Sequence, residues 1–168
     1  MNTKTRLFWI LFVVSLSTGW ALANDNFESA KEFFNAEEYK KAIGLLKKIT
    51  KEDTSYTKAW ILLGESYSRL EKYKKAIKAY QNAIRTDPES EEALFGLGIT
   101  CSRMRKHSIA IDAFKKIIEI NPKNALAHFE LGVSYDSTAR LSYAFEQYKI
   151  LKKLDPNLAE KLYRIILH

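Results

Sequence analysis

The chain has 168 residues, the length of one ordinary domain, and a formal charge of +7. Hydrophobic residues make up 46% of it, with only 6 glycines and 3 prolines, a composition that can bury a core and excludes a disordered protein. Leu, Ile, Ala, Lys and Glu are abundant, which favours an all-α domain. Cys101 is the only cysteine, so no disulfide can form within the chain and packing must hold the fold.

The N-terminal segment differs from the rest of the chain. A basic start at Lys4 and Arg6 precedes an apolar run over residues 7–16, and an Ala-Leu-Ala triplet ends at Ala23. This order is typical of a secretory signal peptide, so we predict one over residues 1–23 and an exported mature protein. The alternative is an uncleaved membrane anchor, although a spanning helix usually has roughly 20 predominantly apolar residues.

An interval of 34 residues recurs through the remainder of the chain and predicts a repeat architecture. Five kinds of position keep the interval: Pro88, Pro122 and Pro156; Gly64, Gly98 and Gly132; Ala42, Ala76, Ala110 and Ala144; Leu63, Leu97 and Leu131; and Tyr80, Phe114 and Tyr148. The interval divides the chain into units at 57–90, 91–124 and 125–158, with a divergent first unit at 23–56 that lacks the tryptophan and the terminal proline.

Each unit shows the apolar spacing of two amphipathic helices. In the second unit, apolar residues three and four apart predict helices over 57–70 and 73–85. The second helix of each unit should stop before its proline, because the residue preceding proline avoids helical geometry. The glycine in each first helix should face the alanine of the second helix, so that the two helices can touch. Large aromatic side chains of the second helix should then fill the flanking space. A last helix over 159–168 should cap the final unit.

The unit at 57–90 resembles a tetratricopeptide repeat, a motif of about 34 residues. The residues that match the W-x2-L-G-x2-Y…A-x3-F…P pattern are Trp60, Leu63, Gly64, Tyr67, Ala76, Tyr80, Ala83 and Pro88. The later units have Leu94 and His128 in place of the tryptophan. The resemblance implies an all-α, right-handed superhelix of antiparallel helix pairs, with about four repeats and a C-terminal capping helix.

In tetratricopeptide proteins the first helices line a concave groove that binds a peptide or helix segment of a partner. Carried over residue by residue, the predicted groove consists of Phe27, Lys31, Phe34, Ile61, Glu65, Arg69, Phe95, Ile99, Arg103, Phe129 and Val133. Aromatic anchors with arginine nearby are typical of a protein-binding hot spot. The alternative is that these residues pack only against their own neighbours, and for Phe129, nearest the cap, both interpretations stand equally.

The sequence shows no cluster of reactive side chains that would indicate catalysis, a metal site or a cofactor. His107, His128 and His168 lack the spacing of metal ligands, and no phosphate-binding loop or G-x-S-x-G turn is present. Cys101 and His128 occupy positions where other repeats carry core aromatic residues, so both are predicted to be structural. We therefore expect a non-catalytic scaffold or adaptor.

Pairs of lysines suggest a second kind of function. They occur at Lys40-Lys41, Lys47-Lys48, Lys74-Lys75, Lys115-Lys116 and Lys152-Lys153, mostly on the predicted second helices. They form either an ordinary solvated surface or a convex face that attracts a membrane or an anionic envelope polymer. Nucleic acid is not expected, because the excess charge is modest and no nucleic-acid motif is present. Exported proteins of this family are familiar in the bacterial periplasm, in envelope assembly and secretion, and open repeat ends leave self-association as an alternative.

Overall fold

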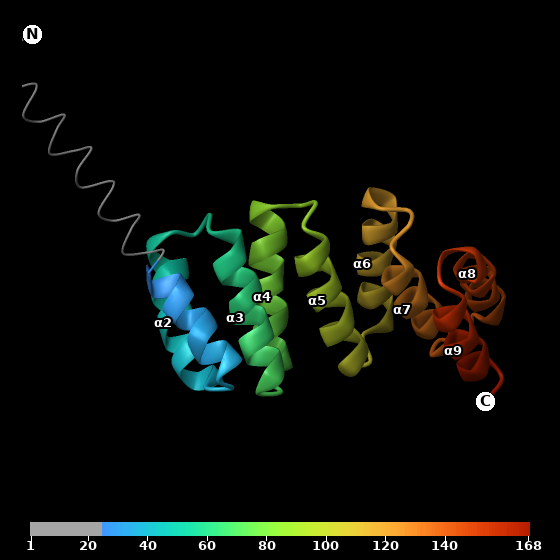
Figure 1. The fold of residues 1–168 in the computed structure, drawn as a ribbon, viewed down its shortest axis with the longest axis horizontal. Helices are drawn as coiled ribbons and strands as arrows, with labels where there is room; N and C mark the ends of the chain where they lie inside the picture. Colours follow the sequence, from blue (N-terminus) through green and yellow to red (C-terminus); the bar gives the residue numbers. More distant parts are fainter. Residues whose placement is uncertain (1–24) are drawn as a thin grey trace, which may run out of the picture.

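The computed structural model describes residues 25–168, in which all regular secondary structure is helical (Figure 1). The predicted signal peptide over 1–23 lies outside the described residues. A helix over 25–35 is followed by eight more: α2 (Tyr39–Glu52), α3 (Thr57–Arg69), α4 (Tyr73–Thr86), α5 (Glu91–Arg103), α6 (His107–Ile120), α7 (Ala125–Asp136), α8 (Leu141–Leu154) and α9 (Pro156–Ile166). Among the described helices, none has the length and apolar character needed to cross a membrane.

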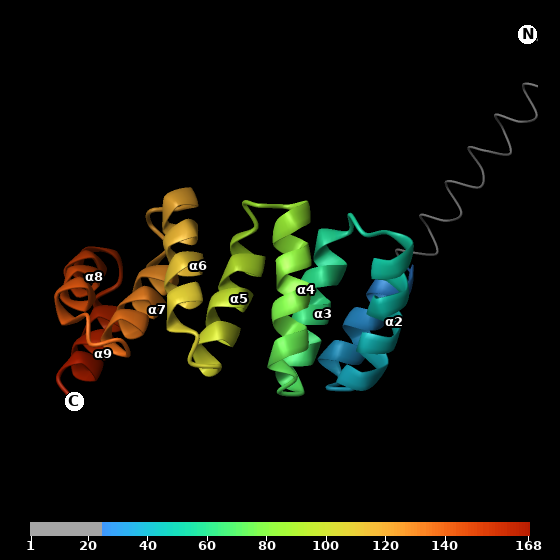
Figure 2. The same cartoon turned by 180° about the vertical axis from the view of Figure 1, so that it is seen from behind.

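The helices pack as consecutive pairs. Contacts join α3 to α4, α5 to α6 and α7 to α8, and each pair also packs against the next one. The pairs follow one another along the long axis of the molecule in chain order, with the C-terminus at the far end from residue 25 (Figures 1 and 2). The last helix, α9, packs against both α7 and α8. The predicted all-α superhelix of helix pairs is confirmed.

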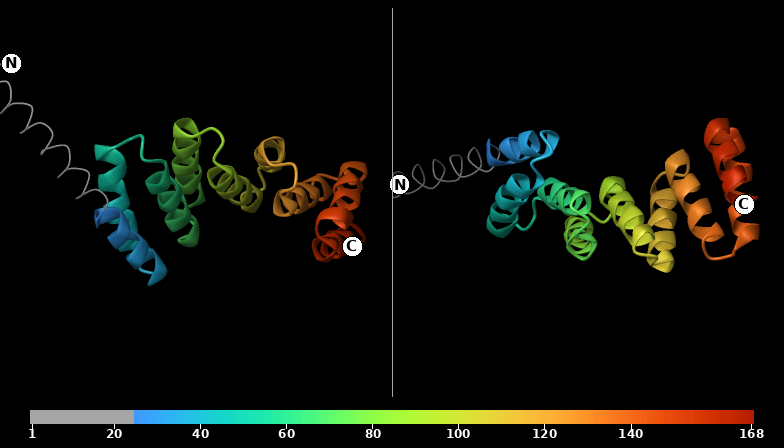
Figure 3. Two further views of the ribbon diagram at one scale, coloured as in Figure 1. Left: turned by 45° about the horizontal axis from the view of Figure 1, so that its top comes forward. Right: turned by 90° about the horizontal axis from the view of Figure 1, so that it is seen from below.

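Neighbouring repeats pack mainly through the second helix of one and the first helix of the next, and their first helices also contact one another. Helix α3 contacts α5, and α5 contacts α7, whereas α2 and α4, α4 and α6, and α6 and α8 do not contact one another. A stack that is closer along one row of helices than along the other must curve toward the closer row, and Figure 3 shows the curved path. We call the surface of α3, α5 and α7 the inner face, and that of α2, α4, α6 and α8 the outer face.

The turn inside each helix pair has the same geometry in all four pairs. Its positive-φ residues, which keep the repeat interval, are Glu37, Glu71, Arg105 and Ala139. The next amide reaches back to a carbonyl in the preceding helix; the Lys72 N–H, for example, donates to the Tyr67 carbonyl at 2.8 Å. Such left-handed C-terminal closures satisfy carbonyls at the helix end. Because none of these residues is glycine, this turn could not be recognised in the sequence.

The connections between pairs follow the prolines. Helices α4, α6 and α8 end before Pro88, Pro122 and Pro156, as expected. Helix α9 begins directly at Pro156, ahead of the predicted start of the cap at 159, because Asp155 ends α8 and also accepts hydrogen bonds from the first amides of α9. Proline suits this first helical position, where its missing N–H has no partner to lose.

The glycines of the first helices make room for large side chains, and at Gly64 and Gly98 these are aromatic rings of the partner helix, as expected. A Cβ on Gly64 would lie 2.7 Å from the Tyr80 ring, and one on Gly98 would lie 2.6 Å from the Phe114 ring. At Gly132 the nearest atom is a methyl group of Leu162 in α9, at 2.5 Å. The aromatic rings and the leucine of the cap therefore pack directly against helix backbone that carries no side chain at these positions.

The core consists of two clusters that meet at the second repeat. The smaller joins helix 25–35, α2 and the start of the second repeat, and the larger extends from α3 to α9. Trp60 and Tyr67 of α3 pack against both clusters. Within the predicted cap over 159–168, Leu162 and Ile166 are buried in the larger cluster, whereas Ile165 is exposed.

Candidate functional site

Four apolar residues of the predicted groove share the central part of the inner face. Phe95 and Ile99 lie on α5, and Phe129 and Val133 lie on α7. All four are half-buried, since each packs one side against the larger core cluster and leaves the rest accessible. The Phe95 ring meets the Phe114 ring edge-on, with 5.8 Å between centroids. This packing holds the exposed part of Phe95 in a fixed position, which suits an anchor for a ligand.

Two other members of the predicted groove lie in the core instead. Phe27 is only 7% exposed and packs against Tyr56, with ring centroids 5.0 Å apart, and Ile61 is 5% exposed within the larger cluster. Their position in the repeat is the one that Phe95 and Phe129 occupy. The apolar residue at this repeat position is thus accessible in only two of the four repeats, on helices α5 and α7.

The remaining predicted residues of the first repeat already have partners. Exposed Lys31 forms an ion pair with Glu28 at 2.9 Å, and its ammonium group lies 5.9 Å from the centre of the Phe27 ring. Phe34 is half-buried with its ring edge-on to Tyr39, 5.4 Å between centroids. Surface ion pairs of this kind contribute little to stability, so Lys31 remains available to an incoming anion.

Charged groups gather around the Tyr80 side chain where α3 meets α5. Burial raises the pKa of the Tyr80 hydroxyl far above its usual value, and the carboxylates of Glu65 and Glu92 add to this effect. Burial also raises the pKa of Glu65, as does Glu92, while Arg69 lowers it. Arg69 and Arg103 are exposed. The inner face therefore carries a mixed-charge region beside the apolar patch.

The sequence places this architecture in a known family. Residues 20–150 match the family described as the C-terminal ARM domain of tetratricopeptide repeat protein 21. The chain belongs to this tetratricopeptide-repeat family. Comparison with curated proteins gives no match.

Solved structures show the same tetratricopeptide fold. A crystal structure of MamA has a TM-score of 0.77 and 25% identity, covering 82% of this chain and 81% of that one. MamA from Desulfovibrio magneticus RS-1 has a TM-score of 0.78 at 17% identity, over 86% and 84% of the two chains. YrrB, described as a TPR protein with an unusual peptide-binding site, has a TM-score of 0.75 at 21% identity, over 91% and 82%.

One residue of the tetratricopeptide inner face was missed by the sequence analysis. Leu126 is 55% exposed on α7 and precedes Phe129 by three positions and Val133 by seven, a spacing that places the three on one side of a helix. That spacing alone could have placed Leu126 on the same surface as Phe129 and Val133. The sequence also did not show that both Gly64 and Gly96 leave room for the Tyr80 ring.

Two of the residues considered for chemistry, Cys101 and His128, are buried in this tetratricopeptide fold. Cys101 is fully buried in the larger cluster, and burial raises the pKa of its thiol, which makes it less reactive. His128 is buried between the Gln147 side chain at 2.7 Å and the Pro122 carbonyl at 3.0 Å. Within residues 25–168, no group of histidine, cysteine and acidic residues is arranged to hold a metal ion.

Proposed function

We propose that this protein is a non-catalytic scaffold that binds a peptide or helix segment of another protein on its inner face. The observation that carries the proposal is the accessible apolar patch on two adjacent inner helices, formed by Phe95, Ile99, Leu126, Phe129 and Val133. Arg103, one helical turn after Ile99 on α5, adds a cation at its edge. Rigid aromatic anchors beside an arginine are the usual composition of a protein-binding hot spot.

The tetratricopeptide fold supports this proposal. YrrB has the same fold and a peptide-binding site. The spacing of the exposed residues on α5 and α7 suits a partner segment that places apolar side chains at regular intervals. The mixed charges of Glu65, Arg69 and Arg103 would then select among partners rather than supply most of the affinity.

We place this activity outside the cytoplasm, in the bacterial periplasm, in envelope assembly or secretion. The support is the basic, apolar and Ala-Leu-Ala order of residues 1–23. We expect protein purified from its native host to begin at Asn24, as measured by intact mass. A mass that still includes the segment 1–23 would contradict export by cleavage and favour the membrane-anchored alternative.

A photo-crosslinking residue at Phe95 tests the inner face directly. Introduced in the native host, it should capture one abundant partner, because the exposed part of the ring lies within the apolar patch. Mass spectrometry would identify the captured protein. The same residue at Lys115, exposed on the outer face in α6, is the control and should not capture that partner.

Capture of the same partner only from Lys115 would overturn the inner-face proposal and favour an outer-face scaffold. Capture only of a second copy of this chain would identify a self-assembling protein instead. Repeating the experiment at high salt tests the alternative that the lysine-rich outer face binds a membrane or an anionic polymer. Attraction by exposed lysines should be lost at high salt, whereas apolar binding on the inner face should persist.

A further inference from the structure

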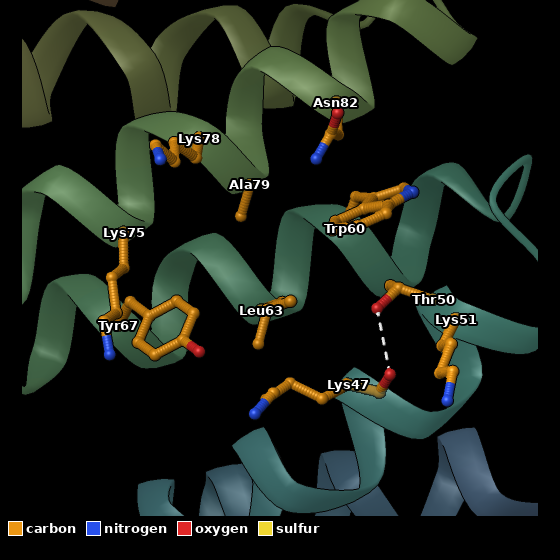
Figure 4. Close-up of a pocket in the computed structure, with 10 residues that line it drawn as sticks. All are labelled: Lys47, Thr50, Lys51, Trp60, Leu63, Tyr67, Lys75, Lys78, Ala79 and Asn82. Carbon is orange, nitrogen blue, oxygen red and sulfur yellow. Dashed lines mark hydrogen bonds between the residues drawn. The ribbon is translucent and has the colours of Figure 1, made fainter.

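A pocket of about 390 Å³ opens on the outer face between α2, α3 and α4. The pocket exists because α2 and α4 both pack on α3 without contacting each other. Its floor lies where the two core clusters meet. Figure 4 shows Leu63 between Trp60 and Tyr67 on α3, with Lys47 and Lys51 contributed by α2 and with Lys75 and Lys78 contributed by α4.

The pocket combines an apolar floor with cationic walls. Trp60 and Tyr67 are half-buried, and the Trp60 indole N–H donates to the Thr54 carbonyl at 2.9 Å, which fixes the ring. All four lysines are exposed, and in the part of the chain that the structure describes none of them forms an ion pair. No residue that lines the pocket is acidic.

This concentration of positive charge does not follow from the repeat. At the equivalent positions one repeat further along the chain, the four lysines are replaced by Gln81, Arg85, Ile109 and Asp112. Two repeats further along, they are replaced by Lys115, Glu119, Tyr143 and Glu146. The first set has no net charge and the second is negative. The tryptophan of the floor is also replaced, by Leu94 and then by His128. A solvated helix face would not need these features to coincide at one interface.

We propose that this pocket binds an acidic segment of a partner protein, which inserts one apolar side chain onto the floor while its carboxylates meet the four lysines. The charge of the walls requires an anionic occupant, because four cations without ion-pair partners around a recess favour negative charge. The floor requires an apolar group, because contact with Trp60, Leu63 and Tyr67 removes apolar surface from water. This second site is on the face opposite the inner apolar patch and does not depend on it.

The position of the floor favours a protein segment over a membrane. Trp60 and Leu63 belong to α3, the inner helix, and are more buried than the lysines of α2 and α4. The flat anionic surface of a membrane would contact the lysines but would leave the apolar floor of the pocket uncovered. A single side chain on an extended segment can enter the recess, whose volume lies within the range of ligand sites.

The test uses the full chain carrying Trp9→Phe and Trp20→Phe, so that Trp60 is its only tryptophan whether or not residues 1–23 are removed. The probe is a short fluorescent peptide in which acidic residues flank a central Leu-Phe pair. It should bind, as measured by anisotropy, and should change the emission of Trp60. Replacing Leu-Phe with Ser-Ser, or the acidic residues with lysines, should weaken binding by about tenfold or more.

A matched pair of variants isolates the pocket. Lys47→Glu with Lys51→Glu should weaken binding of the acidic peptide by about tenfold or more, whereas Lys115→Glu with Arg85→Glu should weaken it by no more than about threefold. The second pair makes the same charge change at the equivalent repeat positions outside the pocket. Equal losses in both variants, or equal binding of the Ser-Ser peptide, would overturn the proposal. So would binding to phosphatidylglycerol vesicles through Lys47 and Lys51 without binding of the peptide.

Discussion

Gly98→Leu should lower the free energy of unfolding by about 3 kcal/mol, although leucine is the better helix former by roughly 0.8 kcal/mol. Even the first added carbon would lie 2.6 Å from the Phe114 ring. That ring is completely buried and also meets the Phe95 ring, so it cannot move aside without displacing its core neighbours. Overpacking should therefore outweigh helix propensity. Urea unfolding followed by circular dichroism measures the change.

Gly44→Leu is the matched control for this prediction. Gly44 lies in the interior of α2, is exposed, and has no atom within 4 Å of a built Cβ. The same substitution there should leave stability unchanged or raise it by up to about 1 kcal/mol. Unchanged stability in Gly98→Leu would show that the larger core cluster can rearrange, and our account of the glycine positions would then be wrong.

The sequence predicted the fold because the repeat displays the same constraint several times. A single glycine in a helix is ambiguous, but Gly64, Gly98 and Gly132 at one interval show a position where any side chain would collide. The three prolines likewise placed the ends of α4, α6 and α8. The contact of Gly132 was less predictable, since the nearest side chain is Leu162 of α9 and not an aromatic ring of its partner helix α8.

The candidate site was harder to predict than the fold, because equivalent positions in different repeats have different surroundings. Phe27 and Ile61 share a repeat position with Phe95 and Phe129, yet only the latter two remain accessible. The burial of each of these side chains depends on the residues of the neighbouring repeat, and the pattern within a single repeat carries no information about those residues. The outer pocket escaped notice for a related reason, since its lysines come from two repeats, and pairs such as Lys74-Lys75 suggested an ordinary solvated face.

Leu162→Ala should cost about 3 kcal/mol of stability, as is usual for a fully buried leucine. Leu162 is 0% exposed on α9, and its methyl groups lie against Gly132 of α7. Leu167→Ala, at a leucine that is 60% exposed at the end of the same helix, should change stability by less than about 0.5 kcal/mol. Equal effects of the two substitutions would show that α9 does not cap the last repeat as the structure describes.

The effect of Gly132→Ala should reverse with the residue at position 162. In the natural protein the added methyl group meets Leu162 at 2.5 Å, so the substitution should destabilise by about 1 kcal/mol or more. In the Leu162→Ala background that obstacle is gone, and the nearest remaining atom is the Gln147 Cβ at 3.3 Å, which needs to move only slightly. The same substitution should then stabilise by about 1 kcal/mol, through helix propensity and partial filling of the cavity. A double-mutant cycle measured by urea unfolding gives this coupling directly, and additive effects would mean that Gly132 and Leu162 do not share the space that the structure assigns to them.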